Sequence, residues 1–390
     1  MLECLAVEVM HSRHLRTVVF GLVLGTLVTL LLYTTPQTLS SVSSFRYDVL
    51  SPDESRESKA GLCRPAHHLM FLKTHKCASS TVQNIFLRYG YKHNLTFALP
   101  RSGNYLGNPQ HFTVDLIPPN LLPRSGKVDI FAVHTRLNVE EHSKILHNDT
   151  RWITIVRDPS ALYESLFNFF HLGDIYGVHL SLFSRVPMAN LMDLPRYGGK
   201  FGRNQMLFDF GYPENITVSE LRGAIEELDN LFDLVMISEY MDESLILLRH
   251  LLCWSLHDLV YFTKNARRRE VKHNLNPATL YALRELNSAD VILYDHFVAR
   301  HRQAVLEFGT RRMAREVSLL RSLREDYFAE CGAHEVRGQD SALLYKEYSG
   351  QVNAYVTANN SGQNCMMLSL PELSLVDAVR LHQRRALNPP

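Results

Sequence analysis

The sequence is poor in cysteine and carries almost no net charge. Six cysteines among 390 residues are too few for a scaffold built on disulfides, and no Cys-x-x-Cys pair or Cys/His cluster has the spacing of a zinc site. Lysine and arginine number 41 against 40 aspartate and glutamate residues, a formal net charge of +1. No overall electric field would therefore gather nucleic acid or anionic lipid, and any anion site has to be local. We expect no metal ion and no nucleic-acid partner.

The N-terminal region contains one long uncharged run, residues 17–35. At about 1.5 Å per residue, this run is just long enough to cross a hydrocarbon core of about 30 Å. A cleaved signal peptide is the alternative, but the run is longer than a usual signal core and no Ala-x-Ala-like site follows it. Arg13 and Arg16 precede the run, and the next basic residue is Arg46. The positive-inside rule therefore predicts a cytoplasmic tail at residues 1–16 and a lumenal C-terminal part.

Residues 36–65 are rich in serine, proline and charge and have little apolar periodicity, which is typical of a stem. With 46% apolar and 21% charged residues, the whole chain has the composition of a globular protein. We assign residues 66–390 to one folded domain. Asn-x-Ser/Thr triplets arise often by chance, but here none lies in the first 35 residues, which agrees with a lumenal domain. The expected glycosylation sites are Asn94, Asn148, Asn215 and Asn359.

Five of the six cysteines lie beyond the predicted anchor and would face an oxidising compartment. Because five is odd, at least one thiol is free or pairs between chains. We expect one bridge between Cys331 and Cys365.

A loop rich in lysine and hydroxyl groups connects a predicted strand to a predicted helix. Residues 68–72 form a short apolar run fit for a buried strand, and apolar residues from Val82 to Tyr89 follow at helical spacing. A strand, a tight loop and a helix N-terminus together present free backbone N–H groups to an anion. The loop lacks both glycines of a Walker motif, so an ATP or GTP enzyme is the weaker interpretation. We call residues 73–81 the anion loop: Lys73, Thr74, His75, Lys76, Cys77, Ala78, Ser79, Ser80 and Thr81.

The anion loop resembles the 5′-phosphosulfate loop of the galactose-3-O-sulfotransferase family, whose sulfate donor is 3′-phosphoadenosine 5′-phosphosulfate (PAPS). The resemblance covers about residues 66–330. Three stretches are most similar to the branch of the family that sulfates galactosylceramide: those near Trp254 and Arg267, and residues 21–25 of the predicted membrane anchor. Further similar segments are residues 153–159 with Ser165, 207–212, 239–245, 251–254, 261–262 and 265–268.

A second motif follows the predicted strand at residues 152–156. Asp158 is placed to cap a helix that begins at Pro159, with Leu162, Leu166 and Phe169 as its buried stripe. Arg157 would thus emerge at the carboxyl end of a strand, where open α/β sheets bind ligands. Its guanidinium, with Ser165 two turns into the helix, can hold the 3′-phosphate of PAPS. The alternative is that Arg157 merely pairs with a neighbouring acid.

Transfer of a sulfuryl group to a hydroxyl of the acceptor molecule requires a base that removes the proton of that hydroxyl. Residues 128–133 are predicted to form a strand that ends at His134, and the family's Asn-His-x-Arg pattern matches here at His134 and Arg136. We expect His134 to be the general base, with His75 as the second candidate and Lys76 neutralising charge on the departing phosphate. Two residues depart from the family pattern, because Cys77 replaces a threonine and Val133 replaces the asparagine before the histidine. These departures bear on acceptor choice and on full activity.

The resemblance implies a P-loop-like sulfotransferase fold for a catalytic domain at residues 66–390: one α/β domain with a central, mostly parallel sheet and helices on both faces. Apolar periodicity predicts two of the helices, at residues 242–250 and 311–324. Their apolar stripes are Leu245, Leu248 and Leu252 in the first and Met313, Val317 and Leu320 in the second. The resemblance also implies a Golgi type II membrane enzyme that sulfates the 3-hydroxyl of terminal β-galactose on galactosylceramide-type glycolipids. Glycoprotein glycans as acceptors, or a catalytically weak glycan-binding protein, are the alternatives, and a homodimer is left open. The expected donor contacts are Lys73, Thr74, Lys76, Ala78, Ser79, Ser80, Thr81, Arg157, Ser165, Arg267 and Arg268. The three consecutive arginines that begin at Arg267 could equally be a solvated face.

Overall fold

The computed structural model describes residues 63–263, 275–337, 353–358 and 361–388. The predicted anchor at residues 17–35, together with Arg267, Arg268 and Asn359, lies outside these ranges. Within them, no helix combines the length and the apolar character needed to cross a membrane.

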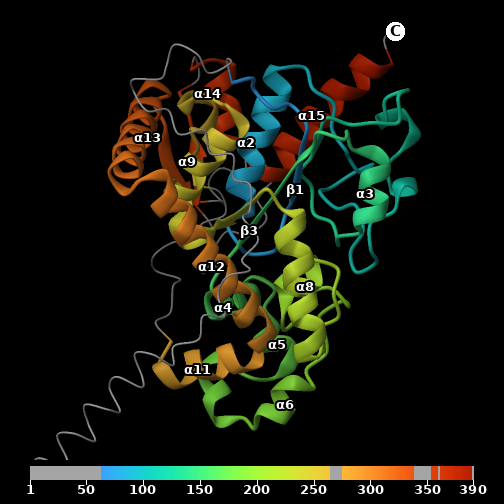
Figure 1. Cartoon of the computed structure of the whole chain (residues 1–390), viewed down its shortest axis with the longest axis vertical. Helices are drawn as coiled ribbons and strands as arrows, with labels where there is room; N and C mark the ends of the chain where they lie inside the picture. The colour runs from blue at the N-terminus through green and yellow to red at the C-terminus, as the bar shows by residue number, and fades with distance from the viewer. Residues whose placement is uncertain (1–62, 264–274, 338–352, 359–360, 389–390) are drawn as a thin grey trace, which may run out of the picture. The chain divides into compact units, whose positions relative to one another are not determined.

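A parallel four-stranded sheet, in the order β2-β1-β3-β4, forms the centre of the described structure (Figure 1). Leu69 of β1 pairs with Ile130 of β2 on one side and with Arg151 of β3 on the other. All four residues of β1 and of β4 are buried, as expected for strands covered on both faces. The strands are β1 (Leu69–Leu72), β2 (Ile130–Phe131), β3 (Arg151–Val156) and β4 (Leu234–Ile237).

The predicted strand at residues 128–133 is confirmed only at its centre, because β2 contains two residues. Beyond β2 the chain leaves the sheet: the Ala132 carbonyl accepts a hydrogen bond from the Gln83 side chain, and the His134 N–H donates to the Asn104 carbonyl. Side chains and loops thus take the backbone groups that a longer strand would have paired.

The strand order reverses next to the anion loop. From β1 the chain first forms β2 on one side of β1 and then crosses to form β3 on the other. Ligands of open α/β sheets bind at the carboxyl ends of strands, where the order reverses in this way. The anion loop follows β1 and Arg157 follows β3, so both lie at this reversal point.

Helices flank the sheet, and α9 and α12 both pack against β4. The α-helices are α2 (Ser79–Lys92), α3 (Val139–Ile145), α4 (Pro159–Phe169), α5 (Leu172–Tyr176), α6 (Met188–Met192), α7 (Gln205–Asp209), α8 (Val218–Leu231), α9 (Met241–Leu252), α10 (Leu256–Leu259), α11 (Pro277–Leu286), α12 (Ser288–Phe308), α13 (Thr310–Glu330), α14 (Gly362–Ser369) and α15 (Glu372–Leu387). A separate antiparallel pair consists of β5 (His334–Arg337) and β6 (Asn353–Val356). Short 3₁₀ helices cover Val114–Leu116, Pro119–Leu121, Leu180–Arg185 and Ser238–Tyr240.

The helices predicted from periodicity are present. The stripe of α9 is fully buried, and α13 begins one residue before the predicted helix and continues six residues beyond it. At the start of α4, the Asp158 carboxylate accepts hydrogen bonds from the N–H groups of Ser160 and Ala161, which confirms the predicted cap. Phe169 differs from the prediction, because it is only half-buried.

Two disulfides cross-link the domain. The expected bridge between Cys331 and Cys365 is confirmed, and it joins the end of α13 to α14. A second bridge, which we did not predict, joins Cys63 to Cys253 at the end of α9. Cys77 is the free, buried cysteine of the described residues, so the prediction of an unpaired thiol also holds.

Candidate functional site

The backbone of the anion loop has a strained shape. Lys76 and Ala78 have φ angles of 60° and 61°, in the left-handed region that residues with a Cβ atom seldom adopt. The turn ends at the first residue of α2, and since the N-cap is Ala78, no side chain caps the first turn of that helix. An uncapped helix N-terminus with its positive dipole end is suited to an anion.

Two of the predicted donor-contacting hydroxyls instead hold the loop in place. The Thr74 hydroxyl donates to the Ile155 carbonyl of β3, and the Ser79 hydroxyl donates to the Thr74 carbonyl at 2.6 Å. The Cys77 thiol also points inward, donating to the His75 carbonyl at 3.3 Å, and it is fully buried. Burial raises the pKa of Cys77, so the thiol stays protonated. The Cys77 side chain is therefore part of the packing beneath the loop.

The Arg157 side chain lies against the backbone of Lys76, beyond the carboxyl ends of β1 and β3. The Lys76 ammonium lies 3.6 Å from the centre of the Phe169 ring, which explains why that ring stays half-buried. The Arg157 guanidinium donates to the Lys76 carbonyl at 2.8 Å and lies 4.0 Å from Glu239. Ser165 lies in α4 and is 5% exposed. The structure thus gives Arg157 a backbone partner and a nearby acid, and its contact with a 3′-phosphate stays a prediction.

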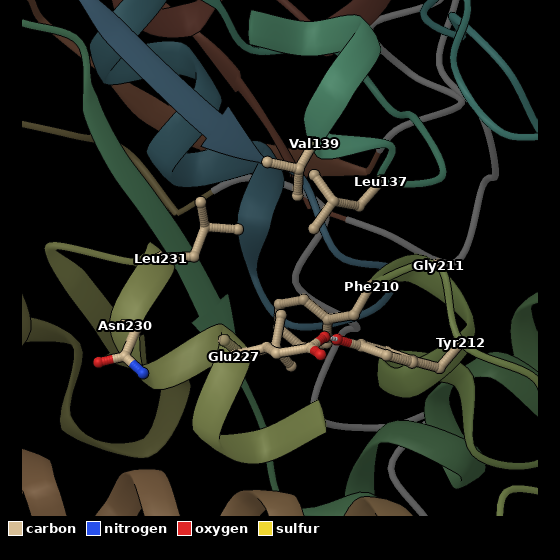
Figure 2. A pocket seen from close by; sticks show the side chains of 9 residues that line it. Leu137, Val139, Phe210, Gly211, Tyr212, Glu227, Asn230 and Leu231 are labelled. Atoms are coloured by element: carbon tan, nitrogen blue, oxygen red, sulfur yellow. Dashed lines mark hydrogen bonds between the residues drawn. The ribbon is translucent and has the colours of Figure 1, made fainter. Parts of the chain in front are cut away.

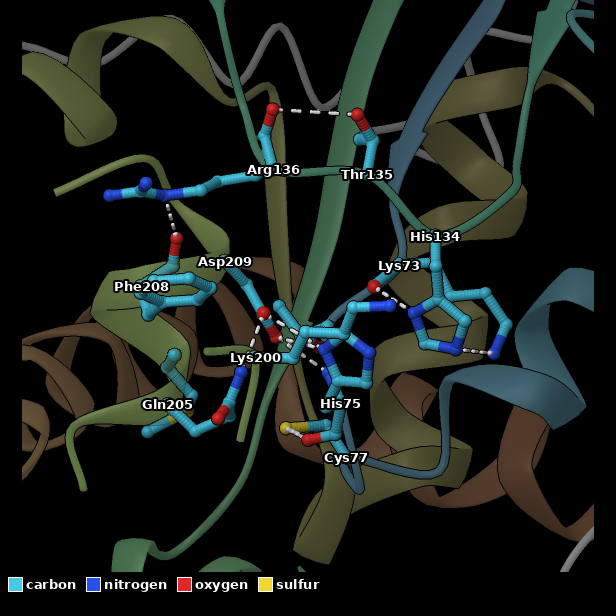
Figure 3. A network of polar contacts seen from close by, with 12 residues as sticks. Lys73, His75, Cys77, His134, Thr135, Arg136, Lys200, Gln205, Phe208 and Asp209 are labelled. Carbon is cyan, nitrogen blue, oxygen red and sulfur yellow. Dashed lines mark hydrogen bonds and ion pairs between the residues drawn. The ribbon is translucent and has the colours of Figure 1, made fainter. Parts of the chain in front are cut away.

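His75 belongs to a buried pair with Asp209 of α7 (Figure 3). The ring Nδ1 lies 2.8 Å from the Asp209 carboxylate, and the backbone N–H of His75 donates to the same carboxylate at 2.7 Å. Because a carboxylate only accepts, Nδ1 carries the proton, and Nε2 is directed at the Tyr105 hydroxyl at 3.1 Å. A histidine oriented by a carboxylate in this way is suited to act as a base.

His134 lies against His75 but has other partners. The two rings stack with their centres 4.2 Å apart. Nδ1 of His134 donates to the Lys73 carbonyl at 2.9 Å, so Nε2 holds the lone pair and accepts from the Lys73 ammonium at 2.8 Å. Burial, followed by the positive charge of Lys73, holds the pKa of His134 well below its usual range. His134 is therefore a neutral imidazole whose lone pair is already engaged.

Lys73 is 1% exposed and forms an ion pair with Glu372, at the start of α15. Burial lowers the pKa of Lys73, while the carboxylate of Glu372 opposes that effect. Burial likewise disfavours ionisation of Glu372, but the charge of Lys73 and several hydrogen bonds outweigh it and hold the pKa of Glu372 below its ordinary value. The site thus contains a buried ion pair directly beneath the anion loop.

Sequence reasoning missed Asp209, Glu372, Tyr105 and Asn104. Asp209 lies within the segment 207–212 that carries the family resemblance, so this signal could have identified it. Glu372 had no such signal, because it lies about 290 residues from the loop and the chain must fold before they meet. Arg136, which follows the predicted base, has a structural role: it donates to the carbonyls of Phe208, Gly211 and Tyr212.

Among the described residues, one cluster has a composition that could suit a metal ion: His68, Asp129 and His147, at the amino ends of the strands. The two imidazole rings stack nearly parallel, with their centres 3.9 Å apart and their planes at 15°. The lone pairs of parallel, stacked rings do not converge on one point, and His68 already bonds to Asp149 at 2.6 Å. The cluster is also at the opposite edge of the sheet from the anion loop.

A mostly apolar cavity of about 550 Å³ adjoins the segment that carries Asp209 (Figure 2). Phe210 and Gly211, the next two residues along the chain, form part of its wall. At its polar edge, the Tyr212 hydroxyl donates to Glu227 at 2.7 Å. Its lining residues are Leu137, Val139, Phe210, Gly211, Tyr212, Glu227, Leu228, Asn230 and Leu231.

Comparison with known proteins agrees with the motifs. Residues 1–349 match the family described as galactose-3-O-sulfotransferase. The chain is 37% identical to mouse (Mus musculus) galactosylceramide sulfotransferase over 301 residues, which cover 73% of this chain and 70% of the relative. It is 36% identical to the human (Homo sapiens) galactosylceramide sulfotransferase over 357 residues, 84% and 82% of the two chains. Human galactose-3-O-sulfotransferase 2 is 35% identical over 274 residues, 68% of each chain.

Proposed function

Because the chain belongs to the galactose-3-O-sulfotransferase family, we propose that it transfers the sulfuryl group of PAPS to the 3-hydroxyl of a terminal β-galactose. The single observation that carries this proposal is the anion loop, where an uncapped helix N-terminus, Lys76 and Arg157 gather at the carboxyl ends of β1 and β3. This combination suits a donor with phosphate and sulfate groups.

The donor would be held by the chain in two places. The N–H groups at the start of α2, with Lys76, suit the 5′-phosphosulfate. Arg157 suits the 3′-phosphate, and Ser165, which is buried in α4, remains a proposed contact from the sequence. Arg267 and Arg268 remain proposed contacts from the sequence. PAPS supplies the activated sulfuryl group, and Lys76 neutralises the negative charge that grows on the departing phosphate.

We propose one of the two stacked histidines as the base that removes the proton of the acceptor hydroxyl. The sequence favoured His134 over His75. The contacts of the folded chain favour His75, because Asp209 orients its ring and stabilises the imidazolium that forms when Nε2 takes the proton. Both Nε2 atoms have a partner. His75 Nε2 faces the neutral hydroxyl of Tyr105, an exposed side chain that an acceptor hydroxyl can replace, whereas His134 Nε2 accepts from the buried ammonium of Lys73. A positioned base contributes roughly 10²–10⁴ to the rate.

The replacement of the family's threonine by Cys77 is compatible with catalytic activity. Its side chain is buried beneath the loop, so a threonine there would face the same interior and would offer no obvious extra contact to the donor. Val133 is also buried. These positions support an active transferase over a glycan-binding protein without catalysis.

For the acceptor we propose galactosylceramide-type glycolipids, as in the names of the mouse and human relatives. The mostly apolar cavity next to Asp209 supports this choice, because an alkyl chain would bury apolar surface there. Glycoprotein glycans are the alternative.

Transfer of labelled sulfate from PAPS to a panel of acceptors tests both the reaction and the acceptor. The panel contains galactosylceramide, a soluble β-galactoside and a galactose-terminated glycopeptide. The absence of labelled product with all three acceptors would contradict the proposal. A nucleotide-triphosphate enzyme would instead lose activity in EDTA.

The proposed location is the Golgi membrane, with residues 17–35 as the anchor and the catalytic domain in the lumen. Three of the proposed glycosylation sites, Asn94, Asn148 and Asn215, have exposed side chains. In cells, the chain should remain with membranes after a carbonate wash and should shift in mobility after glycosidase treatment. A soluble chain without glycans would contradict this location.

A further inference from the structure

The C-terminal helix α15 contributes a buried carboxylate to the anion loop. Glu372 lies beyond residues 1–349, which match the family, and its side chain is 5% exposed. One carboxylate oxygen lies 3.3 Å from the Lys73 ammonium and also accepts from the Asn104 amide, while the other accepts from the Ser80 hydroxyl. Two donors of the anion loop and one from the loop at Asn104 therefore converge on one carboxylate.

We propose that Glu372 is a positioning residue for sulfuryl transfer: it holds Lys73 as an ammonium ion and, through Lys73, fixes His134 and the start of the anion loop. This inference rests on the proposed function, since the anion loop serves there as the donor site.

The hydrogen bonds of Lys73 define its charge. Its nitrogen has three acceptors: the Ser80 hydroxyl at 3.2 Å, His134 Nε2 at 2.8 Å and the Glu372 carboxylate at 3.3 Å. Only an ammonium group has three N–H bonds to donate. The Lys73 carbonyl also accepts from His134 Nδ1, so two hydrogen bonds join Lys73 to His134 and set which ring nitrogen carries the proton.

Glu372 is the acid that balances this buried charge. A buried cation without a partner is costly and tends to lose its proton. Asp209 is the other acid that acts on Lys73, but it is already bonded to His75. The remaining titratable groups near Lys73 cannot replace a carboxylate, because they are neutral or positive; they are His75, Lys76, Cys77 and His134.

Loss of the carboxylate should therefore leave Lys73 as a neutral amine. A neutral amine has two N–H bonds, so one of its three contacts would be lost and His134 would be free to turn or to exchange its proton. The ion pair would lose both of its charges, so the net charge of the site would not change, and the effect on the donor would come from the lost contacts that position His134 and the start of the anion loop.

The test compares Glu372→Gln and Glu372→Asp with Asp377→Asn, a matched control on the same helix whose carboxylate is 67% exposed. The affinity for 3′-phosphoadenosine 5′-phosphate (PAP), by calorimetry, and sulfate transfer are measured from pH 6 to 9. The control should match the wild type. In the glutamine variant, PAP binding should be at least tenfold weaker at pH 8, and this difference should shrink towards pH 6. The difference should be larger at high pH because removal of the carboxylate lowers the pKa of Lys73. A lower pH is then needed to return Lys73 to its ammonium form.

The aspartate variant, whose carboxylate is one methylene further from Lys73, should shift in the same direction by less. A folded glutamine variant with the PAP affinity and pH profile of the control would overturn the proposal, and so would an equal loss at every pH, which would indicate a structural role alone. If the glutamine variant does not fold, the PAP affinity and pH profile of the aspartate variant are compared with those of the control in the same way. A wild-type chain that neither binds PAP nor transfers sulfate would contradict the proposed function before any variant is compared.

Discussion

The carboxylate of Asp209 bonds to His75 at two points, the backbone N–H at 2.7 Å and the ring Nδ1 at 2.8 Å. The two residues are 134 positions apart in the chain. Asp209 thereby fixes both the path of the anion loop and the orientation of the imidazole. A third hydrogen bond, from the Gln205 amide at 2.9 Å, holds the carboxylate in turn.

This relationship predicts separate effects for the two stacked histidines. His75→Ala should lower turnover by roughly 10²–10⁴ while PAP affinity stays within about threefold, because a base acts on the acceptor proton. His134→Ala should weaken PAP binding as well as turnover, because it removes a contact that holds Lys73 and the loop. Calorimetry with PAP and sulfate transfer measure the two effects. The opposite pattern, with turnover alone lost in the His134 variant, would restore His134 as the base.

Arg157→Ala should weaken donor binding by about 10- to 150-fold, because a hydrogen bond to a charged group contributes roughly 1.5–3 kcal/mol. The apparent affinity for the galactose acceptor should change little. Arg151→Ala is the matched control, since Arg151 lies at the other end of the same strand and pairs with Asp233. Titration of PAPS at a saturating acceptor concentration measures the effect. Equal PAPS requirements in the two folded variants would refute the assignment of Arg157 to the donor.

Asp290 predicts a pH dependence of stability. Its carboxylate accepts from the backbone N–H groups of Met206 and Leu207 at the start of α7, and burial raises its pKa to about 7. The folded state therefore holds this proton more tightly than the unfolded state, so its contribution to stability is lost as pH rises from about 4 to 7. Asp290→Asn keeps an acceptor without the charge and should flatten the fall in melting temperature across this range. An unchanged slope would show that Asp290 is not the responsible group.

The thiols should differ in reactivity. Cys77 is fully buried and burial raises its pKa, so iodoacetamide should leave it unlabelled in the native protein at pH 8. Denaturant alone should expose it, while Cys63, Cys253, Cys331 and Cys365 should be labelled only after reduction as well. Peptide mapping by mass spectrometry measures the extent of labelling at each cysteine. Labelling of native Cys77 would contradict its packed position beneath the loop.

Local patterns predicted a large part of this fold. The strand at residues 69–72, the turn into α2, the Asp158 cap and the buried stripes of α9 and α13 depend on interactions within a few residues, which the order of apolar and polar side chains encodes directly. The prediction of a longer strand at residues 128–133 was wrong at its ends, because the Val128 N–H donates to the Ile145 carbonyl and the Ala132 carbonyl accepts from the Gln83 side chain.

The sequence by itself determined the chemistry of the anion loop, because its charges, its hydroxyls and the strand-to-helix turn are contiguous in the chain. Only the tertiary structure decided how the side chains of that loop are used. Asp209 orients His75 and Glu372 balances Lys73, and both contacts join residues more than 130 positions apart. Neither contact is encoded by local pattern, since hydrogen bonds and buried charges depend on distances that exist only once β1, α7 and α15 have packed together.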